Sequence, residues 1–323
     1  MRKVFIVNSR SDSGDLEKFK AAVAGFSEHH KSECEFYYTD HAGHATELAK
    51  KISDGADGNV LIVACGGDGT VHEIANVLAG TDVPMAVVPM GTGNDFARSV
   101  MSEQHRNSCE YCVSELIKDD YEIKPIDLIR VETFDAEGNV IPECSAWCNN
   151  VASIGLDTEV QLSAKTKVLK HPKSVLVRKT AYATSAVGAL FGNRGFDFKY
   201  HASRGDGKPM DSEFSRYTLI SVCNGSYYGN GFCPAPGARV DDGLLDICSV
   251  EDVGLGRAIF LISKYAKGKH VGLMNVDTFQ VTSLSVEATG DKDLNGNYDG
   301  EDFSGRRVEF TCVPKALGLA FYK

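Results

Sequence analysis

Glycine, aspartate and threonine residues occur in this sequence at a spacing that suits phosphate binding. The segment Gly66-Gly67-Asp68-Gly69-Thr70 follows the apolar run 59–64 and precedes a stretch, 71–78, that is apolar at helical spacing. We therefore expect a turn between a strand and a helix. Because the glycines have no side chains, backbone N–H groups can approach an anion there, and the start of a helix adds partial positive charge. An ordinary Asp-Gly turn with Thr70 as helix cap is the alternative.

A second segment, 89–98, offers similar chemistry and reads Pro-Met-Gly-Thr-Gly-Asn-Asp-Phe-Ala-Arg. It follows the strand-like run 84–88 and supplies the hydroxyl of Thr92 and a helix cap at Asn94-Asp95. Successive parallel strands end at one edge of a sheet, where open α/β sheets bind ligands. Asp68 fits beside phosphates only if a cation screens its charge, so we expect Mg²⁺, bound directly or through water. Together the segments predict a kinase.

These two segments resemble the diacylglycerol kinase catalytic-domain family, which includes bacterial lipid kinases and the sphingosine and ceramide kinases. Both parts of the family pattern, Gly-Gly-Asp-Gly-Thr and Pro-x-Gly-Thr-x-Asn-Asp-Phe-Ala-Arg, are matched. The resemblance continues through 221–246 to Tyr298-Asp299-Gly300-Glu301. The first pentapeptide is also similar to one in NAD kinases and phosphofructokinases, whereas the second motif is more specific to lipid kinases. One departure is the loop 8–14, which is longer than the family's and lacks its proline.

The resemblance implies roles for the matched residues. Asp299 and Glu301 are the two candidates for the base that accepts the proton of a lipid hydroxyl, and an acidic hairpin tip is the alternative. Asp242, with the main-chain oxygens of Arg239 and Leu244, would bind a structural Mg²⁺, against the alternative of a plain Asp-Gly turn. Asp68 would organise Mg²⁺ near the phosphates and so act in catalysis. The implied ATP-binding residues are Asn8, Thr39, Gly66, Gly67, Asp68, Gly69, Thr70, Gly91, Thr92, Asn94 and Asp95.

The pattern of strand-like and helix-like stretches predicts two domains in this chain of 323 residues, of which 43% are hydrophobic. In residues 1–125 strands alternate with helices, as in parallel βαβ units. This favours a Rossmann-like α/β nucleotide-binding domain. The resemblance implies that this domain is like that of phosphofructokinase and NAD kinase. The predicted strands are 4–7, 35–38, 60–64 and 85–88, and the predicted helices are 16–26, 45–52, 71–78 and 109–117.

In residues 126–323 strand-like runs predominate, which predicts a mainly antiparallel second domain. The resemblance implies that it is the β-sandwich second domain of a lipid kinase, with last residues that are free to pack back on the first domain. Helices near 174–191 and 255–266 are expected to interrupt it. The predicted strands are 126–133, 145–151, 196–201, 217–223, 244–249, 279–286 and 307–312.

Composition and charge indicate which partners the protein is expected to bind. The net charge of −10 disfavours nucleic-acid binding, and most of it lies in the first domain. Basic residues gather at 165–179, namely Lys165, Lys167, Lys170, His171, Lys173, Arg178 and Lys179, and again at 264–270. Such runs are often solvated faces, but an enzyme with a bilayer-embedded substrate could use them on an anionic membrane. With no signal peptide or membrane-spanning segment expected, we predict a cytoplasmic protein peripheral to the inner face of the membrane, with a homodimer left open.

Other potential metal ligands have better structural explanations. The ten cysteines mostly lie in apolar patterns of reduced thiols, and neither disulfides nor a zinc site at 109–112 and 144–148 is favoured. The acidic stretch 291–302 matches a calcium-loop template at several positions, yet strand-like segments flank it, so we expect an enlarged turn leading to Asp299. His41 and His44 are expected in a solvated loop or helix start.

The sequence therefore predicts an ATP- and Mg²⁺-dependent lipid kinase that binds its acceptor between the domains. Diacylglycerol, with phosphatidic acid as product, is the first choice of acceptor. A sphingoid base or phosphatidylglycerol is the near alternative, and the preference for ATP over GTP stays open. The rival functions are an NAD kinase and an inactive, nucleotide-regulated lipid-binding protein.

Overall fold

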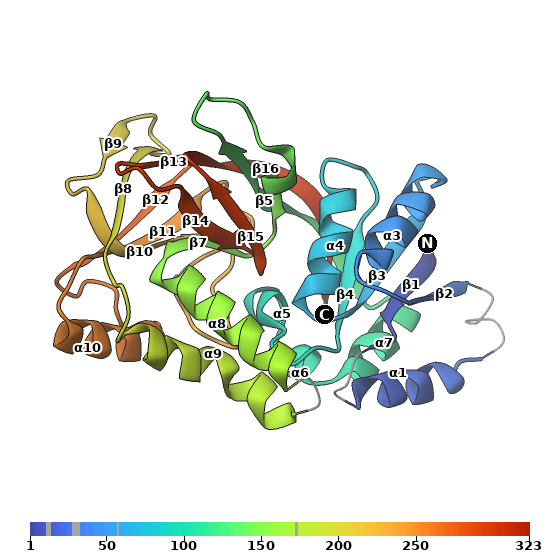
Figure 1. The fold of residues 1–323 in the computed structure, drawn as a ribbon. Coiled ribbons are helices and arrows are strands. Elements are labelled where there is room, and N and C mark those ends of the chain that lie inside the picture. Colours follow the sequence, from blue (N-terminus) through green and yellow to red (C-terminus); the bar gives the residue numbers. More distant parts are fainter. Residues whose placement is uncertain (11–13, 28–32, 57, 172–173) are drawn as a thin grey trace. The chain divides into compact units, whose positions relative to one another are not determined.

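The computed structural model describes residues 1–10, 14–27, 33–56, 58–171 and 174–323 (Figure 1). The chain divides into two compact units, one comprising Met1–Leu128 with Pro314–Lys323 and the other Ile129–Val313. Strands β5 (Tyr121–Phe134) and β16 (Arg307–Tyr322) contribute residues to both units. The predicted boundary at 125 and the division after Leu128 both lie within β5. None of the helices among the described residues is long and apolar enough to cross a membrane.

The first unit is built on a parallel sheet, as its alternating sequence pattern predicts. The strand order is β2 (Cys34–Thr39), β1 (Arg2–Asn8), β3 (Val60–Gly66), β4 (Met85–Pro89) and the end of β16. Every residue of β3 and β4 is buried. These strands read as continuous apolar runs because helices cover both faces of the sheet.

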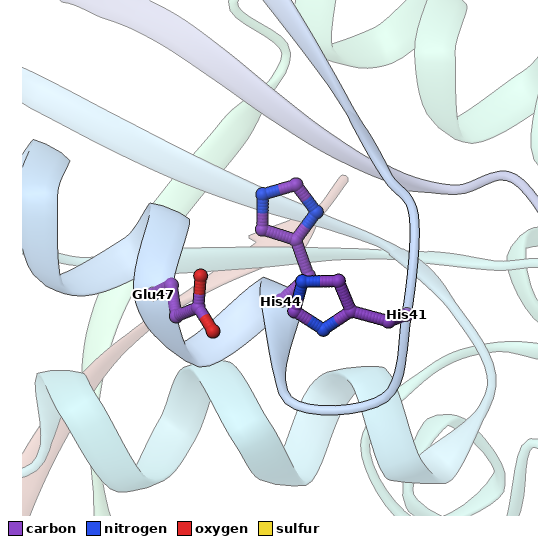
Figure 2. A group of neighbouring side chains, drawn as sticks. All are labelled: His41, His44 and Glu47. Atoms are coloured by element: carbon purple, nitrogen blue, oxygen red, sulfur yellow. The ribbon is translucent and has the colours of Figure 1, made fainter.

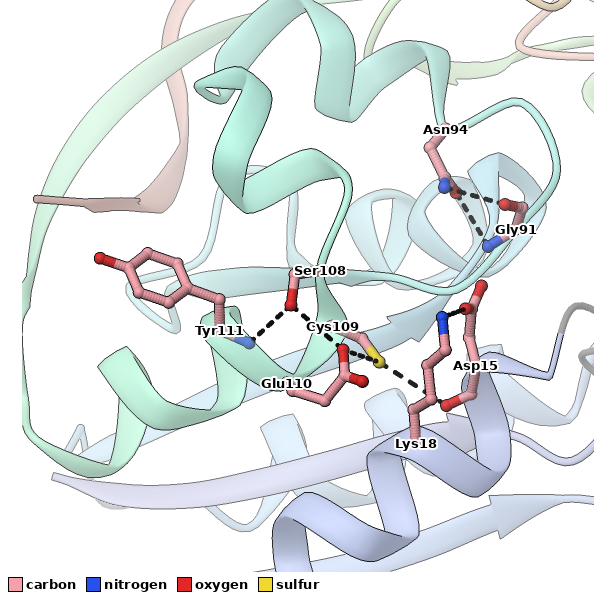
Figure 3. Close-up of polar contacts among 8 residues, drawn as sticks. All are labelled: Asp15, Lys18, Gly91, Asn94, Ser108, Cys109, Glu110 and Tyr111. Carbon is pink, nitrogen blue, oxygen red and sulfur yellow. Dashed lines mark hydrogen bonds and ion pairs between the residues drawn. The ribbon is translucent and has the colours of Figure 1, made fainter.

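Two helix pairs flank this sheet (Figure 1). Helix α3 (His44–Asp54) packs with α4 (Asp68–Leu78), and α1 (Asp15–Ala24) packs with α7 (Cys109–Ile117). Phe5, Phe19 and Cys112 belong to the apolar core between the sheet and α1 and α7. The Cys109 thiol donates to the Asp15 carbonyl, which joins these two helices (Figure 3). The short helices α5 (Asp95–Val100) and α6 (Glu103–Arg106) precede α7.

The second unit is a sandwich of largely antiparallel strands. One layer has the order β12, β11, β10, β7, β14, β15, and the other has β9, β8, β13, β16, β5, β6. Ile129, Phe198, Val222 and Phe310 lie in the core between the layers. The bounds are β6 (Ala146–Cys148), β7 (Val151–Gly155), β8 (Phe196–Ser203), β9 (Pro209–Asp211), β10 (Arg216–Cys223), β11 (Leu245–Glu251), β12 (Val276–Val281), β13 (Ser283–Ala288), β14 (Leu294–Tyr298) and β15 (Glu301–Gly305).

Helices α8 (Leu156–Lys170), α9 (Val175–Ala189) and α10 (Leu255–Tyr265) complete this unit, with a short 3₁₀ helix at Pro142–Cys144. Apolar contacts among Leu156, Leu190 and Ala258 hold the three long helices together. Helix α8 was not predicted. Its buried positions include Asp157, Thr158 and Gln161, so they do not form an apolar pattern.

Two predicted strands and one predicted turn need correction. The run 145–151 is two strands, β6 and β7, separated at Asn149-Asn150, and 279–286 is likewise divided between β12 and β13. The acidic stretch 291–302 is not an enlarged turn, because Leu294–Tyr298 pairs with β7 and forms a hairpin with β15. The polar residues of β14 gave no strand signal, although Gly296, Asn297 and Tyr298 are buried.

Candidate functional site

The first glycine turn connects β3 to α4, as predicted. Gly67 is the N-cap of α4 and has extended backbone angles, φ −90° and ψ −171°. A Cβ atom on Gly66 would collide with the side chain of Thr70, so glycine is required there. The Thr70 hydroxyl oxygen accepts a hydrogen bond from the Asn8 amide, 3.1 Å away, at the end of β1. This turn is therefore held against the neighbouring strand by two residues that the resemblance assigns to ATP.

The second glycine turn closes on itself through Asn94. The Asn94 side chain accepts from the Gly91 N–H and donates to the Gly91 carbonyl, each over 2.9 Å (Figure 3). Asn94 has φ 52°, a left-handed conformation that asparagine tolerates better than most residues. A Cβ on Gly91 would lie 2.5 Å from the Gly67 Cα atom. The two turns therefore touch backbone to backbone, which requires glycine at position 91 and makes a side chain at position 67 tight.

Aspartate side chains fix the start of α5. Asp68 Oδ1 accepts a hydrogen bond from the Phe96 N–H over 3.1 Å, so the carboxylate of the first motif caps the helix of the second. Asp95 is buried, with Oδ1 3.5 Å from Arg98 Nε, and Arg98 Nε also donates to the Gly93 carbonyl over 3.1 Å. These contacts hold the loop that carries Thr92.

A pocket of about 220 Å³ opens beside the first turn. It lies within the first unit, at the carboxyl ends of β1 and β2 and the start of α4. A Cβ on Gly69 would have no neighbour within 4 Å, so the backbone is open to the space there. Of the predicted ATP-binding residues, Asn8, Thr39, Gly69 and Thr70 line this pocket, whereas Gly66, Gly67, Asp68, Gly91, Thr92, Asn94 and Asp95 are not among its lining residues.

His41, which also lines the pocket, forms a group with His44 and Glu47 whose potential ligand atoms lie within 4.8 Å of one another (Figure 2). The imidazole rings are stacked, with centroids 4.8 Å apart and planes 13° apart. Nitrogen lone pairs lie in the ring plane, so two stacked rings do not direct them at one ion. His44 Nδ1 accepts from the Asp40 N–H over 3.0 Å, which anchors the start of α3. We assign no metal to this group.

In the second unit, the Asp299-Gly300 turn joins β14 to β15. Asp299 and Gly300 have φ 47° and 97°, and Tyr298 pairs with Glu301. Two left-handed residues in a two-residue loop are the hallmark of a type I′ hairpin, for which Asp-Gly is a favoured sequence. Glu301 is exposed at the first position of β15.

The Asp299 carboxylate is held by main-chain donors. Its oxygens accept hydrogen bonds from the N–H groups of Asn149, Asn150 and Val151 over 2.6, 3.0 and 3.2 Å. The Asp299 N–H in turn donates to the Val151 carbonyl over 3.0 Å. The three donors stand where the predicted strand 145–151 is interrupted, so the interruption supplies a binding site for this carboxylate.

A buried polar network lies behind this hairpin. Asp157, at the start of α8, accepts hydrogen bonds from Ser153 over 2.5 Å, from Tyr228 over 2.7 Å and from Tyr182. Ser153 in turn accepts from the Asn297 amide of β14 over 2.9 Å. Burial raises the pKa of Asp157 to about 6, against the opposing effect of these hydrogen bonds. The carboxyl faces a small cavity of about 40 Å³ with mainly apolar walls from α8, α9, α10 and the sheet.

The predicted structural metal position is a tight turn. Asp242 Oδ1 accepts from the Leu244 N–H over 3.1 Å, and Gly243 has φ 75°. The side chain of Arg239 pairs with Asp241, 3.1 Å away. Burial raises the pKa of nearby Asp246, and the negative charge of Asp242 adds to this rise. The Asp242 carboxylate and the main-chain oxygens of Arg239 and Leu244 are oxygen donors of the kind that Mg²⁺ binds, so the residues present fit the ion.

Comparisons with known proteins agree with this architecture. Residues 2–131 match the diacylglycerol kinase catalytic domain, and residues 150–321 match the YegS C-terminal NAD kinase beta sandwich-like domain. The "Probable lipid kinase YegS-like" of Xanthomonas campestris pv. campestris (strain 8004) is 30% identical over 270 residues, covering 82% of this chain and 79% of that protein. The chain belongs to the diacylglycerol kinase and YegS-like lipid kinase family.

Other relatives support the same membership. The "Diacylglycerol kinase" of Mycobacterium tuberculosis (strain CDC 1551 / Oshkosh) is 29% identical over 270 residues, covering 84% of this chain and 78% of that protein. A crystal structure of a protein from Bacillus anthracis str. Sterne, provisionally assigned as a diacylglycerol kinase, has a TM-score of 0.72. It shares 22% identity and covers 100% of this chain and 97% of its own, which shows the common fold.

Within this lipid kinase fold, sequence reasoning missed two charged residues that line the pocket, Arg10 and Glu73. Arg10 donates to the Asp40 carbonyl over 2.8 Å, and Glu73 accepts from the N–H groups of Gly43 and Thr46, each over 3.2 Å. Arg10 could have been predicted as a pocket residue, because it is a basic residue two positions after the first strand. Glu73 could not, because its position resembles an exposed position of an amphipathic helix.

The basic segment is only partly described. Lys173 and the side chains of Arg178 and Lys179 lie outside the described residues. Lys165 forms an ion pair with Asp302, 2.9 Å away, and Lys167 donates to the Thr184 hydroxyl over 3.1 Å. Large apolar side chains are exposed on α8, α9 and α10 and in the segments that follow α9 and α10, namely Leu162, Leu169, Leu176, Val187, Phe191, Ile259, Phe260, Val271 and Met274.

Proposed function

We propose that this lipid kinase transfers the γ-phosphate of ATP to a hydroxyl group of diacylglycerol and so forms phosphatidic acid. The observation that carries the proposal is the pocket lined by Asn8, Thr39, Gly69 and Thr70 in a chain of this family. A nucleotide with its phosphates over Gly69 would meet backbone N–H groups at the start of α4, which have no acceptor within the helix. The relative named diacylglycerol kinase supports the choice of acceptor.

Arg10 and Asp68 would complete the phosphate site. The guanidinium group of Arg10 lines the pocket and suits phosphate oxygens. Asp68 uses Oδ1 to cap α5, so its carboxylate stands between the two glycine turns. Mg²⁺ bound there, through water, would neutralise charge on the phosphates during transfer. Residues outside the pocket lining, such as Gly67 and Gly91, would act by keeping the two turns in contact.

Glu301 is the better candidate for the base. The Asp299 oxygens already accept three main-chain hydrogen bonds, which hold that carboxylate in the fold. Glu301 is exposed two residues later, on a rigid hairpin. An exposed carboxylate can come within hydrogen-bond reach of an acceptor hydroxyl, whereas the Asp299 oxygens are already engaged by main-chain donors. We therefore propose that Glu301 takes the proton and that Asp299 anchors the turn.

A peripheral membrane contact and a structural ion extend the proposal. Lys167 and Lys170, with the exposed apolar side chains of Leu169 and Leu176, would face an anionic leaflet. Lys165 is less available, because it pairs with Asp302. Asp242 and the main-chain oxygens of Arg239 and Leu244 would hold Mg²⁺ and stabilise the second unit without taking part in transfer.

The test is incubation with γ-labelled ATP, Mg²⁺ and vesicles that each contain one lipid alcohol, with NAD in a parallel reaction. We expect labelled phosphatidic acid from diacylglycerol at the highest rate. A higher rate on a sphingoid base or phosphatidylglycerol would change the assigned acceptor. Labelled NADP as the sole product would replace the proposal with an NAD kinase, and nucleotide binding without any transfer would indicate an inactive lipid-binding protein.

A further inference from the structure

The hairpin that carries Glu301 has a second attachment, on the side of helix α8. Gln161 is 9% exposed, and its amide donates to the Gly300 carbonyl over 2.8 Å and to Asp302 Oδ1 over 3.0 Å. Lys165, one helical turn later, binds the other oxygen of the same carboxylate, with Nζ 2.9 Å from Asp302 Oδ2. Both residues next to Glu301 in the chain are thus tied to α8.

This attachment fixes the direction of the Glu301 side chain. Successive side chains in a strand point to opposite faces, so when Asp302 is bonded to α8, Glu301 points away from that helix. Asp299 secures the turn on the main chain at 149–151, and the pairing of β15 with β14 holds the Glu301 backbone. Gln161 adds hydrogen bonds on both sides of Glu301, to Gly300 and to Asp302.

We infer that Gln161 is a positioning residue for phosphoryl transfer, acting through the backbone of the hairpin on the Glu301 carboxylate. The inference rests on the proposed role of Glu301 as the base. A base must stay within hydrogen-bond reach of the acceptor hydroxyl, and a displacement of about 1 Å can lower a rate by about 10². Gln161 contributes no group to the reaction. Its effect is to keep the carboxylate in place.

The substitution Gln161→Leu removes the amide donor at similar size. We expect it to lower kcat on a short-chain diacylglycerol at least about tenfold, with little change in the KM for ATP, because the nucleotide pocket lies in the other unit. Gln161→Lys, which keeps a long donor, should recover part of the rate. The matched control is Gln280→Leu. Gln280 lies on strand β12, and its amide also donates a hydrogen bond to an aspartate, Asp246, over 3.3 Å.

A double-mutant cycle with Glu301→Gln separates positioning from general loss of structure. If Gln161 acts through Glu301, Gln161→Leu should slow single-turnover transfer in the wild type and have little further effect in the Glu301→Gln background. Melting temperatures measured alongside show whether each variant is folded.

The inference is overturned if Gln161→Leu matches Gln280→Leu in kcat, or if its effect multiplies fully with that of Glu301→Gln. If Glu301→Gln itself keeps the wild-type rate, the base assignment is wrong and the inference fails with it. If the wild type phosphorylates no lipid alcohol at all, the proposed function fails first, which the lipid screen shows independently of these variants.

Discussion

Two carboxylates separated by one glycine have different surroundings in this hairpin, because Asp299 accepts main-chain hydrogen bonds and Glu301 is exposed. From sequence, Asp299 and Glu301 were equivalent candidates for the base, because their residue types and the family motif do not distinguish them. The three main-chain donors at Asn149, Asn150 and Val151 separate them. No local pattern could reveal these contacts, since the partners lie far apart in the chain.

The first prediction concerns these two residues. Glu301→Gln should reduce kcat by at least about 10², the usual effect of losing an acid–base group, and leave the melting temperature near that of the wild type. Asp299→Asn should lower the melting temperature, because an amide nitrogen cannot accept the N–H bonds, and each buried unpaired donor costs about 1–3 kcal/mol. Calorimetry measures the melting temperatures, and single-turnover transfer measures the rates of phosphate transfer. An unchanged melting temperature in Asp299→Asn would contradict its anchoring role.

A second prediction follows from the buried carboxyl of Asp157, whose pKa burial raises to about 6 from 3.8. The folded state therefore binds this proton more tightly than the unfolded state. Its stabilising contribution is complete below about pH 4 and is lost as the pH rises through 6, a change of about 3 kcal/mol in the free energy of unfolding. Asp157→Asn should remove this dependence.

Urea unfolding of wild type and Asp157→Asn at pH 4, 5, 6 and 7 measures the difference. We expect the wild type to lose stability relative to the variant across this range. Glu137→Gln, a change in an exposed hairpin loop, serves as the control and should run parallel to the wild type. If the free energy of unfolding of Asp157→Asn also changes with pH in parallel with that of the wild type, the folded state does not bind this proton more tightly than the unfolded state.

At the scale of elements, the sequence correctly predicted the helices and strands whose buried side chains are apolar and recur at the period of the element. The strands β1, β3 and β4 and the helices α4 and α7 formed where expected, since each buries apolar side chains. Helix α8 and strand β14 were missed because they bury polar groups, Asp157 and Gln161 in one and Asn297 in the other. Those same groups form hydrogen bonds to the hairpin of Glu301 or within the network behind it. The elements that the sequence pattern failed to predict therefore lie near the candidate site.

The contact between the two glycine turns gives a third prediction. A Cβ in Gly91→Ala would lie 2.5 Å from Gly67 Cα and 2.8 Å from Asn94 Oδ1, so the turns must separate. We expect ATP affinity to fall at least about tenfold, since the N–H groups of the first turn would shift from the phosphates. Gly237→Ala is the control, because its Cβ would have no neighbour within 4 Å. Equal nucleotide affinities in direct binding measurements on the two variants would rule out this contact as the support of the phosphate site.

At the scale of the whole molecule, a net charge of −10 opposes approach to an anionic membrane unless basic residues gather locally. We predict that reversing Lys167 and Lys170 to Glu lowers the rate on anionic vesicles several-fold and changes the rate on short-chain diacylglycerol little. Each cation near such a leaflet contributes about 1 kcal/mol, screened over about 8 Å at physiological salt. Reversal of Lys199 and Lys208, also exposed in the second unit, is the charge-matched control. An equal loss of rate on both substrates would show that Lys167 and Lys170 contribute to folding or to the active site instead of to membrane binding.

We propose above all that this chain transfers phosphate from ATP to a lipid alcohol. The most direct test is a single-turnover reaction in which the protein, in excess over γ-labelled ATP, is mixed with diacylglycerol vesicles and Mg²⁺, with Glu301→Gln run in parallel. We predict that the label appears in phosphatidic acid with the wild type and at least about 10² more slowly with the variant. Release of the label as inorganic phosphate alone, or its complete retention in ATP with every lipid alcohol supplied, would contradict the account.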